Sequence, residues 1–120
     1  MLEILDIGTD DIIAYRLERK IAEEEVAQVL ALFRKKIAEG SKINVYQEVV
    51  SFGGVEVDAI IEKLKFFKEL GFSHFGNIAV VTQKKWLHKL VDLEGKLFRN
   101  INMKGFSIED KELAIEFLQS

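Results

Sequence analysis

Three observations predict an α/β fold in which a mixed, mostly parallel five-stranded sheet is covered by four helices. Short β-branched segments alternate with longer segments of helical periodicity along the 120 residues. The chain opens with two strand-like segments in succession, and Gly8-Thr9-Asp10 between them is typical of a turn. Strands that alternate with helices pair in parallel, whereas an opening hairpin adds an antiparallel strand. The predicted order is β-β-α-β-α-β-α-β-α, in one domain over residues 1–120.

The elements follow one another with few residues between them. The predicted strands cover residues 2–7, 11–17, 43–50, 77–81 and 101–106. The predicted helices cover residues 21–39, 55–70 and 83–98, and a fourth follows residues 107–110. The run at 77–81 is short, apolar and β-branched, which is typical of a strand buried on both faces.

The helix over 21–39 has the clearest pattern. Its apolar residues recur on one face at helical spacing, as Val26, Val29, Leu30, Phe33 and Ile37. Glutamates occupy its first turns and basic residues its last, which suits the helix dipole, and Gly40 supplies the stop. The last helix is expected to open on a capping box formed by Ser107 and Asp110.

Composition and charge restrict the class of protein. The hydrophobic fraction of 48% and the charged fraction of 31% are those of a globular domain. The chain has no cysteine, which excludes a disulfide, a thiolate metal site and a catalytic thiol. A net charge of −3 argues against nucleic acid as a partner. We expect a cytoplasmic protein, because the sequence shows neither a signal peptide nor a membrane span.

Two segments resemble a known family. The opening Met1-Leu2-Glu3-Ile4-Leu5-Asp6-Ile7-Gly8 and the run Ile-Ala-Val-Val-Thr-Gln-Lys-Lys-Trp-Leu at 78–87 are similar to SpoIIAA-like proteins, a family of bacterial STAS-type domains. A strand that runs into Lys-Lys-Trp-Leu recurs in that family, and the likeness spans nearly the whole chain. It implies a STAS-like fold, which is also compared with lipid-carrying CRAL-TRIO domains, and an association with lipid or membrane.

The same resemblance raises the question of a phosphorylated serine. Anti-sigma-factor antagonists of the wider superfamily carry Asp-Ser-x-Gly after the third strand, and that serine is phosphorylated. The matching stretch here is Val50-Ser51-Phe52-Gly53, in which valine stands in place of the aspartate. Ser51 is therefore a candidate phosphoacceptor without an assigned role.

The segment after the fourth strand is the main candidate for a ligand site. Ligands of parallel sheets gather beyond the carboxyl ends of the strands. Lys84 and Lys85 fall in the first turn of the predicted helix, where the helix dipole disfavours positive charge unless an anion binds there. Thr82 would supply a hydrogen bond, and Trp86 and Phe66 an apolar contact. The alternative is that both lysines point into water and Thr82 or Gln83 caps the helix.

Other features are weaker candidates. Gly53-Gly54 before a helix is compatible with a phosphate cradle, but the pair lacks the spacing of a phosphate loop and is more typical of a tight turn. Apolar residues of the helix at 83–98 spread wider than one sheet contact requires, and Phe66 lies roughly opposite the apolar face of the helix at 55–70. Either these helices also pack on each other, or they face a ligand, a membrane or a second copy of the chain.

No pattern in the sequence predicts catalysis. His74 and His88 are the only imidazoles, no serine sits in a nucleophile elbow, and no spacing suits a metal. We therefore expect a non-catalytic module without cofactor that binds an anionic small molecule or lipid headgroup, with reversible contact at the inner membrane face. The competing hypothesis is a protein-interaction or regulatory module, acting through Ser51 or as a homodimer.

Overall fold

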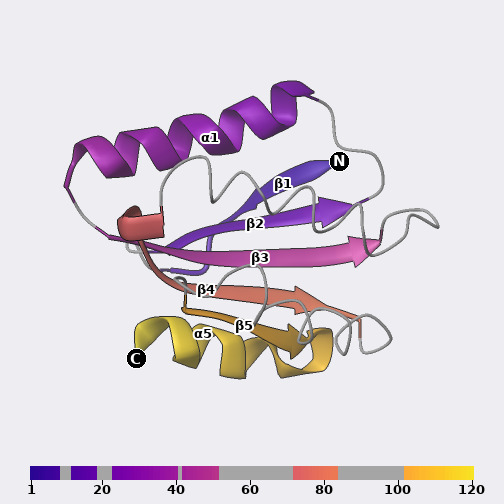
Figure 1. Cartoon of the computed structure of the whole chain (residues 1–120). Coiled ribbons are helices and arrows are strands. Elements are labelled where there is room, and N and C mark those ends of the chain that lie inside the picture. Colours follow the sequence, from indigo (N-terminus) through magenta and orange to yellow (C-terminus); the bar gives the residue numbers. More distant parts are fainter. Residues whose placement is uncertain (9–11, 19–22, 41, 52–71, 84–101) are drawn as a thin grey trace.

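The structure, a computed structural model, describes residues 1–8, 12–18, 23–40, 42–51, 72–83 and 102–120 (Figure 1). Its strands are β1 (Leu2–Leu5), β2 (Ile12–Glu18), β3 (Ile43–Ser51), β4 (Phe75–Thr82) and β5 (Asn102–Ser107). They form one sheet in the order β1-β2-β3-β4-β5, in which β1 is antiparallel to β2 and the other neighbours are parallel. The predicted five-stranded, mostly parallel sheet is confirmed.

The described residues contain two α-helices, α1 (Glu23–Ala38) and α5 (Lys111–Gln119), and two 3₁₀ turns, Phe72–His74 and Ile108–Asp110. The predicted order with four helices therefore differs from the order that these residues give, which is β-β-α-β-β-β-α. The predicted helices at 55–70 and 83–98 lie outside the described residues except for Gln83, which is not helical. Its side-chain amide donates to the carbonyl of Val50, 2.8 Å away, so Gln83 extends the contact between β3 and β4.

The capping prediction for the last helix is wrong in its detail. The hydroxyl of Ser107 donates to the carboxylate of Asp110, 3.0 Å away, and neither side chain caps a backbone N–H. A 3₁₀ turn over Ile108–Asp110 lies between Ser107 and the start of α5. The stop at Gly40 is confirmed, since this glycine has a φ of +80° and its N–H donates to the carbonyl of Ile37.

Each face of the sheet packs against one described helix, because successive side chains of a strand point to opposite faces (Figure 1). On one face, Val29 and Phe33 of α1 pack among buried side chains of β2, β3 and β4. On the other, Ala114 and Leu118 of α5 pack on the sheet residues Tyr46, Ala79, Val81 and Phe106. Strand β4 contributes to both clusters, which confirms that it is buried on both faces.

The amino end of β4 is fixed by a close approach of two strands. Gly76 lies beside Asn44 of β3, and a Cβ on Gly76 would come within 2.5 Å of the Asn44 Oδ1 atom. That oxygen accepts a hydrogen bond from the backbone N–H of Asn77 at 2.8 Å. A side chain at position 76 would therefore displace the Asn44 side chain from this contact between β3 and β4.

Candidate functional site

A shallow pocket of about 280 Å³ lies at the carboxyl ends of β2 and β3, beside the start of α5. Parallel strands end at a common edge, and ligands of such sheets are usually bound there. Helix α5 packs on β3, β4 and β5, so the pocket opens where the helix stops covering this face. Its lining residues are Arg16, Glu18, Glu48, Val50, Ile108 and Lys111.

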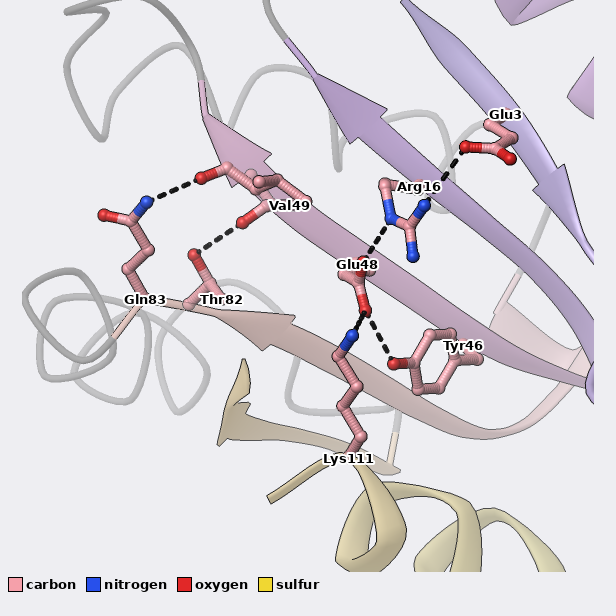
Figure 2. A network of polar contacts seen from close by, with 9 residues as sticks. Glu3, Arg16, Tyr46, Glu48, Val49, Thr82, Gln83 and Lys111 are labelled. Atoms are coloured by element: carbon pink, nitrogen blue, oxygen red, sulfur yellow. Dashed lines mark hydrogen bonds and ion pairs between the residues drawn. The ribbon is translucent and has the colours of Figure 1, made fainter. Parts of the chain in front are cut away.

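Glu48 is the centre of a polar network on this face (Figure 2). Its side chain is only 2% exposed, and both carboxylate oxygens accept hydrogen bonds. The Arg16 Nε donates to one oxygen. The Lys111 Nζ lies 3.1 Å from the other, and the Tyr46 hydroxyl donates to that same oxygen at 3.0 Å. A buried carboxylate is tolerated when it is paired and hydrogen-bonded in this way.

The network joins four elements of the fold, β1, β2, β3 and α5. Arg16 and Glu48 are directly opposite each other in the parallel register of β2 and β3. Arg16 also contacts Glu3 of β1, with 3.1 Å between its Nη1 atom and the carboxylate. Lys111 is the first residue of α5, so its contact with Glu48 joins the helix to the sheet.

These contacts set the protonation of the network. Burial acts to raise the pKa of Glu48, but the hydrogen bonds from Arg16, Lys111 and Tyr46 outweigh burial, so its pKa is lowered from the ordinary value of 4.5. The pKa of Tyr46 is raised by burial and by the adjacent Glu48 charge. At neutral pH Glu48 is therefore an anion and Tyr46 a neutral hydrogen-bond donor.

A second buried polar pair lies on the opposite face of the sheet. The Tyr15 hydroxyl donates to the Gln47 Oε1 atom, and both side chains are buried in the cluster beneath α1. The Gln47 Nε2 atom has no hydrogen-bond partner among the described residues. This pair has no described cavity beside it, and it contributes to packing and not to the pocket.

Two of the residues expected at the ligand site, Thr82 and Ser51, lie within the described part of the chain. Thr82 was expected in the loop after the fourth strand, but it is the last residue of β4 and is fully buried, and its hydroxyl donates to the carbonyl of Val49 at 3.2 Å. Ser51 ends β3, where its backbone pairs with Glu18 after a register shift. The remaining expected residues, Phe66, Gly53, Gly54, Lys84, Lys85 and Trp86, lie outside the described residues.

Sequence reasoning missed the residues of the network. One signal was available, because Glu48 is the one charged residue in the run Val-Tyr-Gln-Glu-Val-Val of a central strand. A charged side chain that is buried on a central strand needs a partner of opposite charge or a hydrogen-bond donor. The partner could not be named from the sequence, since Arg16 lies 32 residues away in the chain. In the part of the chain that the structure describes, no three histidine, aspartate or glutamate side chains are grouped to hold a metal ion.

The comparison with protein families agrees with this fold. The family model described as SpoIIAA-like matches residues 12–119, and the chain belongs to this family. No curated protein and no solved structure matches it. SpoIIAA-like domains are binding or regulatory modules that are in general not enzymes, and they have the capacity for protein interaction. Neither of the two described helices is long and apolar enough to cross a membrane.

Proposed function

We propose that this SpoIIAA-like chain is a non-catalytic module in the cytoplasm that binds an anionic lipid headgroup or another phosphate-bearing ligand and associates reversibly with the inner membrane face. The ligand meets the carboxyl edge of the sheet. One observation carries this proposal, namely that β2, β3 and β4 end together at that edge, and Lys84 and Lys85 follow directly after Gln83.

The roles of the residues follow from this placement. Lys84 and Lys85 supply positive charge, and Trp86 and Phe66 supply apolar contact with the ligand. Thr82 is buried and bonded to Val49, so its part is to hold the end of β4 against β3. Gln83 does the same through its bond to Val50. Two cross-strand bonds therefore fix the backbone from which Lys84 and Lys85 extend.

The network around Glu48 is not the source of positive charge in this proposal. Arg16 and Lys111 are held by Glu48 and Glu3, which balance their charges. Phosphate binding requires cations whose charge is not already neutralised. The anionic ligand is therefore assigned to Lys84 and Lys85.

Vesicle flotation tests the proposal. Wild-type protein is mixed with anionic phosphatidylglycerol vesicles or with zwitterionic phosphatidylcholine vesicles, and compared with Lys84→Glu/Lys85→Glu. The control is Arg34→Glu/Lys35→Glu, which makes the same change of charge on exposed residues of α1. We expect wild type and the control to float with anionic vesicles, and the Lys84/Lys85 variant to stay behind. Equal flotation of both variants would reject the assigned site, and no flotation of wild type would reject membrane association.

Family membership favours a second candidate, a protein-interaction or regulatory module of the anti-sigma-factor-antagonist type. Ser51 ends β3 at the same carboxyl edge, where a modified serine would change the charge presented to a partner protein or to a second copy of the chain. Intact-mass spectrometry of protein isolated from cells, followed by Ser51→Ala, tests this. A phosphate that disappears in Ser51→Ala supports the candidate, and unmodified protein under all growth conditions contradicts it.

A further inference from the structure

Glu18 is the charged residue of the pocket whose side chain has no partner. Glu18 lines the pocket, and within the described residues its carboxylate makes neither an ion pair nor a hydrogen bond. The backbone of Glu18 is held in place by mutual hydrogen bonds with Met1 and by pairing with Ser51. Glu18 is therefore anchored through its backbone at the end of β2, and its partly buried side chain lies at the pocket.

The other charges around the pocket balance one another. Arg16 and Lys111 are positive, and Glu48 and Glu3 take up their hydrogen bonds. With Glu18 included, and with the Met1 ammonium at its backbone paired to Glu25, the group holds three positive and four negative charges, and the two positive residues that line the pocket are Arg16 and Lys111. A cationic ligand is therefore favoured over an anionic one, because the two positive residues are already neutralised at short range.

The remaining walls of the pocket are apolar. Val50 comes from the end of β3, and Ile108 comes from the 3₁₀ turn that precedes α5. A ligand that fits this lining has a short hydrocarbon chain that ends in a cation, since the chain gains from contact with the aliphatic side chains and the cation from contact with the carboxylate.

We propose that this pocket binds an alkylammonium group, with its charge at Glu18 and its carbon chain against Val50 and Ile108. The group comes either from a free amine or from a lysine side chain of another protein. This binding uses neither Lys84 nor Lys85, so it is tested independently of the function proposed above.

Amide chemical-shift titration tests the proposal at constant ionic strength. The probes are n-butylammonium, butyrate as a chain of the same length with opposite charge, and the tripeptide acetyl-Gly-Lys-Gly-amide. We expect n-butylammonium to produce saturable shifts at the amides of Glu18, Val50 and Ile108, and butyrate to produce none there. The dissociation constant for n-butylammonium should rise about fivefold in Glu18→Gln, as expected for one partly exposed ion pair.

Two further variants make the result specific. Glu24→Gln removes the same charge from an exposed position on α1 and should leave the dissociation constant unchanged. Glu18→Asp retains the charge and should bind n-butylammonium more tightly than Glu18→Gln does. Tighter binding of the tripeptide than of n-butylammonium would identify a protein lysine as the source, and the reverse would identify a free amine. Shifts that do not saturate, equal binding by Glu18→Gln, or saturation by butyrate at the same amides would overturn the proposal.

Discussion

Replacing Glu48 by glutamine tests whether its charge holds the β2–β3–α5 network together. The change keeps the size of the side chain but removes the charge that Arg16 and Lys111 share. A hydrogen bond to a charged group contributes about 1.5–3 kcal/mol, which applies to the partly buried Arg16 contact. The Lys111 side chain is 43% exposed, so its contact adds only about 0.2–1 kcal/mol.

These contributions are partly offset because a neutral amide costs less to bury than a carboxylate. We therefore expect Glu48→Gln to lower the free energy of unfolding by about 2–3 kcal/mol. In a chain of this length that corresponds to a fall of about 10 °C in the melting temperature. Urea denaturation at pH 7 measures the change. Glu3→Gln, at a side chain that is 52% exposed, is the matched control and should cost under about 1 kcal/mol.

The pH dependence of the same difference is a sharper test. The pKa of Glu48 is lower in the folded chain than its ordinary value of 4.5. Its stabilising contribution is therefore fully present above that value, and it is lost as the pH falls through the folded-state pKa. The difference between wild type and Glu48→Gln should be constant from pH 7 to about pH 5.5 and should shrink below about pH 4.5. A variant as stable as wild type at pH 7, or a difference that grows in acid, would refute this reasoning.

Three further changes probe the packing around the network and in the core. Gly76→Ala should destabilise by about 1–3 kcal/mol in urea denaturation, because the new Cβ displaces the Asn44 side chain, and Asn44→Ala in the same chain should recover part of the loss. Tyr15→Phe should cost about 1–3 kcal/mol by leaving a second atom of the Gln47 amide unpaired, whereas Tyr15→Phe/Gln47→Leu should melt nearly like wild type; a cycle without coupling would contradict the buried pair. Lys111→Gln should lower the free energy of unfolding by at most about 1 kcal/mol, and a larger loss would show that its ion pair is not screened by solvent.

Local patterns were sufficient to predict the sheet and its first helix. The β-branched runs that became β2, β3 and β4 each pack on the core, so burial and periodicity agree along their length. The apolar face of α1 is buried as predicted at Val29 and Phe33. Gly40 ends the helix with a positive φ, a backbone conformation that is costly for any residue with a side chain. These features depend on residues that are close together in the sequence.

Features that depend on distant residues were not predicted. The sequence around Glu48 does not identify the partners of its charge, because Arg16 and Lys111 reach it only through the sheet register and the docking of α5.

The start of the last helix shows that a local pattern can also have two outcomes. Ser107 and Asp110 have the spacing of a capping box, yet they bond to each other and open a 3₁₀ turn. Two side chains with capping potential can satisfy one another, and spacing alone does not distinguish the two outcomes.

The central claim is that the ligand of this module meets the carboxyl edge of the sheet. The most direct test maps amide chemical shifts while dihexanoyl phosphatidylglycerol, a soluble anionic lipid, is added to wild-type protein. The account predicts shifts at Ser51 and Gln83, where β3 and β4 end, and none at Asn44 and Asn77 near the amino ends of the same strands. Shifts confined to the amino ends or to α1 would contradict it.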